Sequence, residues 1–182
     1  MDEYLDVLDA QGKPTGRVAL KSEVHQKGLY HATVHVWFHT PQGQVLLQQR
    51  GKDKDTHPLL WDVSVAGHIG AGEAITSAAV REVDEEIGLQ IGTGSLSSIG
   101  RFTSVQHHPN LLDREFQHCF LSPLNVPLQR LSKQESEVAD LKLISLEDFK
   151  AMWAHPVRSQ DLVPHSRFYY QSIFRAIEDK LE

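Results

Sequence analysis

The sequence has only one cysteine, Cys119, among its 182 residues. A single thiol cannot form a disulfide within the chain, and chains without this crosslink are typical of reducing compartments. We therefore expect a cytoplasmic protein in which Cys119 is a small residue of the core.

The chain also lacks a long apolar run and an excess of basic residues. No stretch approaches the ~20 apolar residues that a membrane helix requires, and the acidic N-terminus is unlike a secretory signal. With 18 Lys and Arg against 24 Asp and Glu, the formal net charge is −6. This charge provides no general field for holding duplex nucleic acid. We expect neither membrane nor duplex nucleic acid as a partner, so a polyanionic substrate has to be bound by local positive charge.

What the sequence does contain is the pattern of a sheet flanked by helices. Strand-forming residues between turn signals predict an N-terminal hairpin, two antiparallel central strands, a short strand with a glycine-rich loop, and two later strands. These segments are 4–9 with 18–20, 32–38 with 44–49, 58–72, 98–103 and 115–121; a polar loop with His107, His108, Pro109 and Asn110 joins the last two.

Apolar residues at helical spacing predict helices over 74–87, 146–152 and 166–181. In the last helix, Phe168, Ile173, Phe174 and Ile177 are expected to pack on the sheet. No repeat or linker divides the chain. We expect one α/β domain over residues 1–182, in which the hairpin is an N-terminal extension and a helix ends the chain.

The helix over 74–87 carries three glutamates on one face. Glu82, Glu85 and Glu86 are neighbours at i, i+3 and i+4. They lie toward the helix C-terminus, where the macrodipole disfavours each anion by roughly 0.3 to 1 kcal/mol. Such a cluster is usually a solvated surface, but a divalent cation such as Mg²⁺ would remove the repulsion and could bridge to substrate phosphates.

The surrounding residues favour the metal site. The pattern Gly67-x5-Glu73-x7-Arg81-Glu82-Val83-x-Glu85-Glu86-x-Gly88-Leu89 resembles the Nudix box at every specified position. The resemblance implies the Nudix fold, a mixed β-sheet sandwiched between α-helices. It also implies that Glu82, Glu85 and Glu86 bind Mg²⁺ or Mn²⁺, and that the backbone of Gly67 approaches the metal. Arg81 is expected to pair with Glu73 and Glu85 and to fix the carboxylates in place.

Outside the box, the order of landmarks resembles the isopentenyl-diphosphate isomerase branch. It is more similar still to isomerase-like hydrolases, including those fused in plants to a dipeptidyl-peptidase-III-like domain. The shared residues are His25, Tyr30-His31, Val34-His35-Val36-Trp37, Trp61-Asp62 and Ala66-Gly67-His68. In the isomerase a catalytic cysteine directly precedes this glycine, whereas Ala66 stands here and cannot transfer a proton. The isomerase's catalytic tyrosine falls near Thr103.

The same resemblance implies further site residues. His25, His31, His68 and Glu115 match a second group of metal ligands, and imidazole suits zinc or manganese better than magnesium. Lys21, Arg50 and Lys54 match basic residues that grip the diphosphate. Glu115 is alternatively a general base, or an exposed acid at a strand edge, and the role of Asp113 stays open. The basic residues are otherwise solvent-exposed charge, and each histidine an ordinary polar group.

Together these patterns predict a metal-dependent hydrolase that cleaves a phosphoanhydride linkage in a small organic or nucleoside diphosphate. The candidate catalytic residues are Arg81 and three alternative bases, Glu85, Glu86 and Glu115. The alternatives are an isopentenyl-diphosphate isomerase and a non-catalytic regulatory module. The substrate and the oligomeric state, including a homodimer, stay open at this point.

Overall fold

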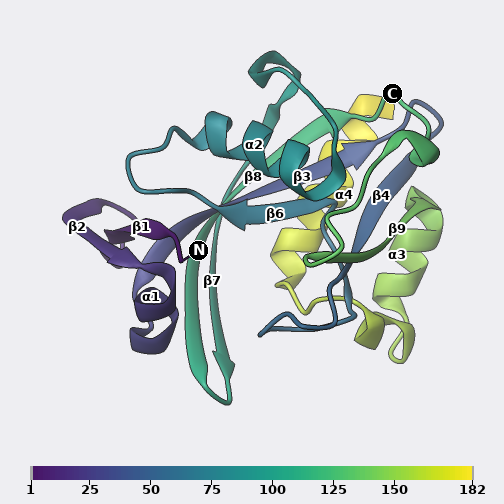
Figure 1. The fold of residues 1–182 in the computed structure, drawn as a ribbon. Helices are drawn as coiled ribbons and strands as arrows, with labels where there is room; N and C mark the ends of the chain where they lie inside the picture. The colour runs from purple at the N-terminus through teal and green to yellow at the C-terminus, as the bar shows by residue number, and fades with distance from the viewer. Residues whose placement is uncertain (1, 182) are drawn as a thin grey trace.

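The computed structural model of the chain describes residues 2–181 and contains one mixed sheet with helices on both faces (Figure 1). The strands are β1 (Tyr4–Leu8), β2 (Pro14–Leu20), β3 (Tyr30–His39), β4 (Gln44–Arg50), β5 (Trp61–Asp62), β6 (Val65–His68), β7 (Ser97–His108), β8 (Leu111–Pro123) and β9 (Val138–Ser145). The helices are α1 (Lys21–Lys27), α2 (Ile75–Ile87), α3 (Leu146–Ala154) and α4 (Arg167–Leu181).

Strand β3 organises the sheet. It pairs in parallel with β8, from Tyr30 opposite Arg114 to His39 opposite Pro123, and antiparallel with β6, β4 and β1. Strand β9 extends the sheet on the far side of β4. This mixture of parallel and antiparallel pairs is the mixed sheet that the sequence predicts.

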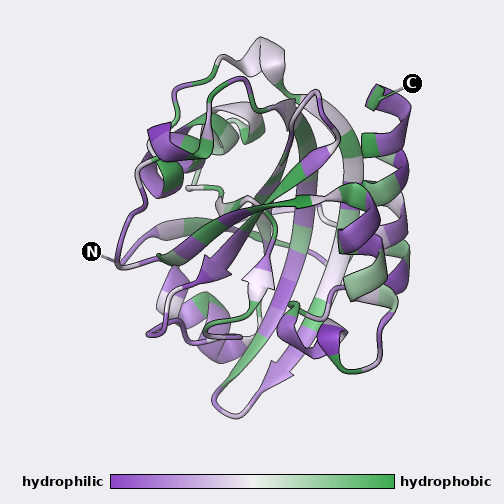
Figure 2. Ribbon diagram, turned by 90° about the vertical axis from the view of Figure 1, so that its right-hand side faces the viewer, coloured by the Kyte–Doolittle hydropathy of each residue, from purple (hydrophilic) through white to green (hydrophobic). Residues whose placement is uncertain are grey.

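The two faces of β3 supply two separate cores. Val34, Val36 and Phe38 pack with Ala79 and Val83 of α2 on one face. On the opposite face, Trp37 packs with residues of α3 and α4, among them Phe149, Tyr169 and Ile173. Successive strand residues point to opposite faces, so one buried strand serves both cores. Figure 2 shows green and purple residues alternating along α4, as expected for a helix with one packed face.

Most predicted elements are confirmed, with several corrections. The polar loop expected around His107 is mostly strand, because β7 and β8 continue as a long hairpin whose turn is Pro109 and Asn110. Phe168 is 70% exposed, so only part of its ring packs on the sheet, against Phe102 of β7 at a centroid distance of 5.7 Å. Helix α1 and strand β9 were not predicted. Cys119 is a buried core residue, as expected.

Among residues 2–181, no helix is long and apolar enough to cross a membrane.

Candidate active site

Helix α2 presents two of its glutamates to a pocket. Its apolar side, including Ala79, Val83 and Ile87, is buried against the sheet, and Gly88 ends the helix in the left-handed conformation at φ 63°. Glu82 and Glu86 border that apolar side and are themselves buried, whereas the Glu85 side chain is 51% exposed. All three line the same pocket, which has a volume of about 340 Å³.

The Glu86 carboxylate reaches deepest into the protein. It accepts hydrogen bonds from Gln48 Nε2 at 3.1 Å and from the Ala66 backbone N–H at 3.3 Å. Burial, together with the nearby negative charge of Glu82, raises the pKa of Glu86 to about 8. Burial also raises the pKa of Glu82. Two carboxyls held close together at such a cost make a site that a cation would stabilise.

Gly67 is a glycine because Glu82 occupies the space that a side chain would need. A Cβ built on Gly67 would lie 1.9 Å from Glu82 Cδ and 2.3 Å from either carboxylate oxygen. The backbone of β6 therefore lies directly against this carboxylate. The absence of a side chain at Gly67 thus has a steric cause, and the approach of its backbone to a metal stays a prediction.

Arg81 holds the carboxylates in position. Its guanidinium donates to both oxygens of Glu73 at 2.9 Å, to Glu82 at 2.8 Å and to Glu85 at 3.1 Å. It also donates to the His68 backbone carbonyl at 3.0 Å, which ties the helix to β6. The predicted pairs with Glu73 and Glu85 are confirmed, and the contact with Glu82 adds to them.

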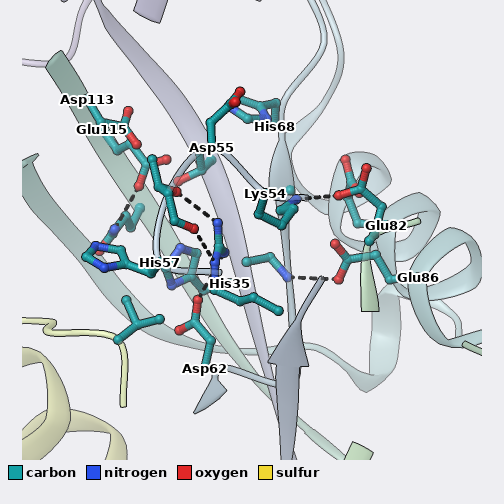
Figure 3. Close-up of a pocket in the computed structure, with 18 of the residues that line it drawn as sticks. His35, Lys54, Asp55, His57, Asp62, His68, Glu82, Glu86, Asp113 and Glu115 are labelled. Carbon is teal, nitrogen blue, oxygen red and sulfur yellow. Dashed lines mark hydrogen bonds and ion pairs between the residues drawn. The ribbon is translucent and has the colours of Figure 1, made fainter. Parts of the chain in front are cut away.

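A second group of ligand-type side chains lies across the pocket, around His31. The structure brings His25 of α1, His31 of β3 and His68 of β6 together, with donor atoms within 4.8 Å of one another. His31 also belongs to a group of the same size with Asp113 and Glu115 of β8. Figure 3 shows these acids on the side of the pocket opposite Glu82 and Glu86.

The chemistry of this histidine cluster fits a cation. His31 Nδ1 lies 3.2 Å from the Leu29 carbonyl, so it carries the proton and Nε2 is a free electron-pair donor. Within residues 2–181, His31 Nε2 and Asp113 Oδ1 are buried without a hydrogen-bond partner, 3.7 Å apart. Burial lowers the pKa of all three histidines and so favours the neutral form that binds metals.

Burial also raises the pKa of the two acids in this cluster. The pKa of Asp113 is raised to about 6 by burial and by the neighbouring charge of Glu115, and burial raises the pKa of Glu115 as well. Glu115 accepts a hydrogen bond from Gln117 Nε2 at 2.8 Å. The residues present therefore suit a metal with mixed imidazole and carboxylate ligands, which zinc and manganese accept.

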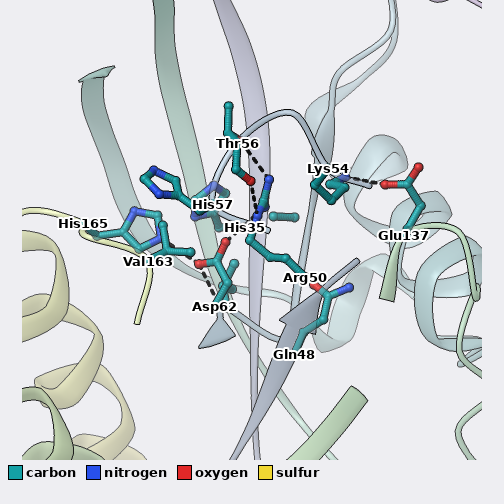
Figure 4. Close-up of polar contacts among 12 residues, drawn as sticks. His35, Gln48, Arg50, Lys54, Thr56, His57, Asp62, Glu137, Val163 and His165 are labelled. Carbon is teal, nitrogen blue, oxygen red and sulfur yellow. Dashed lines mark hydrogen bonds and ion pairs between the residues drawn. The ribbon is translucent and has the colours of Figure 1, made fainter. Parts of the chain in front are cut away.

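The three predicted basic residues all line the pocket, in different surroundings. Lys54 forms an ion pair with Glu137. Arg50 donates to Asp62 at 3.3 Å and to the Thr56 carbonyl and hydroxyl, so its guanidinium is already engaged (Figure 4). Lys21 lies at the junction of β2 and α1. Within residues 2–181 Lys21 has no ion pair, so it is the best placed of the three to contact a diphosphate.

Sequence reasoning missed several residues of the pocket. His35 and Asp62 entered only as shared landmarks, and Thr33, Gln117 and His165 had no role. His165 lies beyond every motif, in the segment between α3 and α4, and reaches the pocket through its contact with Asp62. The polar residues at alternate positions of β3 were the signal that could have found this wall of the pocket. A strand buried on both faces is normally apolar throughout, so polar residues in it indicate a site.

Comparison with known proteins identifies the family. The NUDIX domain model matches residues 29–165, which include the whole pattern around α2. The chain belongs to the Nudix hydrolase family. This match confirms the family predicted from the box.

Relatives of this Nudix protein carry both hydrolase and isomerase names. Nudix hydrolase 3 of Arabidopsis thaliana is 36% identical over 82% of the chain, but the chain spans only 20% of that protein. An uncharacterized Nudix hydrolase of Clostridium acetobutylicum is 30% identical and aligns over 98% of both chains. Isopentenyl-diphosphate Delta-isomerase 2 of Photorhabdus laumondii is 31% identical over 84% of the chain and 82% of its own length.

Solved structures confirm the Nudix fold. A protein of Deinococcus radiodurans superposes with a TM-score of 0.68 at 17% identity, covering 94% of this chain and 98% of its own. The NUDIX domain of Shewanella oneidensis NrtR, crystallised with ADP ribose, has a TM-score of 0.56 at 18% identity and covers 83% and 88%.

Proposed function

We propose that this Nudix protein is a metal-dependent hydrolase that cleaves the phosphoanhydride linkage of a small organic or nucleoside diphosphate. The observation that supports this proposal best is the arrangement of Glu82 and Glu86. Both are buried, Glu82 against Gly67 and Glu86 against the Ala66 N–H, and they share a pocket with Lys21 and Lys54. The pocket thus combines carboxylates for a cation with cations for a phosphate.

The chain's own residues supply distinct parts of the reaction. Glu82, Glu85 and Glu86 would hold Mg²⁺ or Mn²⁺, and Arg81 fixes the carboxylates of Glu82 and Glu85. When bound, the cation neutralises charge on the diphosphate and lowers the pKa of an attacking water. A carboxylate of the site takes the water proton, with Glu85, Glu86 and Glu115 as the candidates.

The histidine cluster would hold a further cation across the pocket. His25, His31, His68 and Glu115, joined by Asp113, are the residues proposed for it, and the unpartnered Nε2 of His31 supports that role. The acids of this cluster lie across the same cavity from the α2 glutamates. The diphosphate would lie between the two groups of ligands.

An isopentenyl-diphosphate isomerase is the second candidate, because relatives that align over most of the chain carry that name. Its chemistry requires a proton donor and an acceptor on either side of the isoprenoid. The residue before Gly67 is Ala66, which offers no proton. A non-catalytic regulatory domain is a third candidate, but all the box glutamates are present.

One assay separates these candidates. The purified protein is incubated with Mg²⁺ or Mn²⁺ and a panel of diphosphates, including isopentenyl, dimethylallyl and thiamine diphosphates and nucleotide derivatives. Both phosphate release and double-bond isomerisation are scored. We expect phosphate-ester products that disappear in Glu86→Gln and persist in Asp84→Asn, which changes an exposed acid on the same helix. Isomerised product without cleavage would contradict the proposal, and no turnover of any kind would favour the regulatory domain.

A further inference from the structure

One side of β3 is polar at three alternate positions, two of which, Thr33 and His35, line the pocket. His31, Thr33 and His35 alternate with Val34 and Val36, which face the core beneath α2. At about 3.3 Å per residue, this polar row extends roughly 13 Å from the histidine cluster along the pocket. It stops at Trp37, which belongs to the opposite core. The polar residues are therefore confined to the part of β3 beside the pocket and do not continue along the whole strand.

The neighbouring strand continues the same wall. Gln117 of β8 lies opposite Thr33 in the parallel register and is buried, like Thr33. Its Nε2 donates to Glu115 at 2.8 Å, which leaves the amide oxygen as an acceptor. Thr33 Oγ1 lies in the pocket wall without a hydrogen-bond partner anywhere in residues 2–181, although Thr33 is only 3% exposed.

His35 adds a donor to this wall. The indole N–H of Trp37 donates to the Tyr169 hydroxyl oxygen at 3.0 Å, and that oxygen lies 2.7 Å from His35 Nδ1. The Tyr169 hydroxyl still has its own hydrogen to donate, and in the tautomer that receives it His35 Nδ1 is the acceptor. The imidazole then carries its proton on Nε2. Burial lowers the pKa of His35 to about 3, so the ring is neutral.

Asp62 and His165 close the far end of the wall (Figure 4). His165 Nε2 lies 2.8 Å from Asp62 Oδ1, and Arg50 donates to Oδ2. Burial alone would raise the pKa of Asp62, but His165 and Arg50 lower it. Asp62 is therefore an ion satisfied by the protein and does not require a ligand. Thr33, His35 and Gln117 are the groups left for a ligand.

We propose that Thr33, His35 and Gln117 form a recognition subsite for the organic group of the diphosphate. This proposal rests on the proposed hydrolysis. The subsite takes a group that carries both hydrogen-bond donors and acceptors, such as a sugar or a heterocyclic base. An isoprenyl chain in the same place would offer no hydrogen-bond partner to these three polar groups. Sites built to form hydrogen bonds discriminate strongly against ligands that cannot form them.

Steady-state kinetics on matched substrates test this subsite. Hydrolysis of ADP-ribose, nucleoside diphosphates and thiamine diphosphate is compared with hydrolysis of isopentenyl, dimethylallyl and n-butyl diphosphates. We expect kcat/KM for at least one polar substrate to exceed that for every alkyl substrate by about 100-fold or more. Thr33→Val keeps the side-chain shape and removes the hydroxyl. It should lower kcat/KM for that polar substrate about three- to tenfold without lowering kcat/KM for the alkyl diphosphates.

Two controls make the result decisive. Thr93→Val makes the same change at an exposed position outside the pocket and should alter neither substrate class. Because Thr33 Oγ1 has no partner, Thr33→Val should retain the wild-type melting temperature, which excludes misfolding as the cause. Efficient hydrolysis of alkyl diphosphates, or equal kinetics for Thr33→Val and wild type, overturns the subsite while hydrolysis stands. If no diphosphate is cleaved, the proposed hydrolysis itself is overturned.

Discussion

The two sides of the pocket are built in different ways. The glutamate side comes from helix α2 and the preceding strand β6, and its members lie between Gly67 and Glu86. The histidine cluster comes from α1, β3, β6 and β8, and its members are spread from His25 to Glu115. Local spacing fixes the first group, whereas the second exists only because β3 pairs with both β6 and β8. We therefore expect substitutions on the two sides of the pocket to have separable effects on activity and metal binding.

The largest effect is expected from the glutamate side. Glu86→Gln removes the charge of a buried carboxylate while keeping an amide that can still contact Gln48 and the Ala66 N–H. We expect kcat to fall between about 10²- and 10⁴-fold, because this group is a proposed metal ligand and a candidate base. Phosphate release under saturating substrate measures the effect. Full activity in the variant would remove Glu86 from the mechanism.

Gly67→Ala tests the steric link between β6 and the same carboxylate. The added methyl would lie 1.9 Å from Glu82 Cδ, so the Glu82 side chain has to move. A displacement of this size is expected to lower kcat about 100-fold. Gly92→Ala is the matched control, because a Cβ there meets no atom within 4 Å. Equal activities of the two variants would show that the close contact has no catalytic role.

His31→Gln tests whether the histidine cluster is a separate metal site. Removing its unpartnered Nε2 should weaken Mn²⁺ binding about 10- to 100-fold at one class of site, with a second class retained at the glutamates. Calorimetric titration with Mn²⁺ counts the sites and gives their affinities. His118→Gln, at a half-buried β8 position outside the pocket, is the control. A single class of site, unchanged by His31→Gln, would show that the histidine cluster is not a separate metal site.

The smallest effect is expected at His35, between the two sides. Its folded-state pKa of about 3 lies below the ordinary value of 6.5. The unfolded chain therefore binds the extra proton first, and stability is lost as the pH falls below 6.5. Asp62, Arg50, His165 and Tyr169 surround the ring and remain in the variant. His35→Gln should remove about 1.4 kcal/mol of the change in unfolding free energy between pH 7.5 and 5.5.

Urea unfolding in metal-free buffer at the two pH values measures this difference. His107→Gln replaces an exposed histidine and serves as the control. The comparison between variants isolates His35 from buried carboxyls whose raised pKa acts in the opposite direction, such as Glu86. An identical pH dependence in wild type and His35→Gln would show that the ring is not held neutral by burial.

The same contrast explains how much could be predicted from the sequence. Helix α2, its glutamates and the contact of Arg81 with Glu85 follow from spacing, because neighbours on a helix are fixed by its geometry. The role of Gly67 came from the family resemblance. The histidine cluster was expected only through family resemblance. No spacing rule joins His25 to Asp113, because strand pairing between distant segments brings them together.

The missed elements have physical reasons of their own. Helix α1 has seven residues, no side-chain cap and one buried residue, Val24, so it shows little periodicity. The outer half of the β7–β8 hairpin is largely polar and has no core to impose an alternating pattern. Phe168 matched the apolar spacing of α4 but lies at the helix start with its side chain mostly in solvent.

Hydrolysis in this pocket would transfer a phosphoryl group to water, so oxygen from the solvent has to enter a product. Turnover in H₂¹⁸O, followed by mass spectrometry, measures this incorporation. We expect one ¹⁸O atom in a phosphate product, dependent on the divalent metal and lost in Glu86→Gln. Isomerised diphosphate that carries solvent deuterium from D₂O and contains no ¹⁸O would contradict hydrolysis.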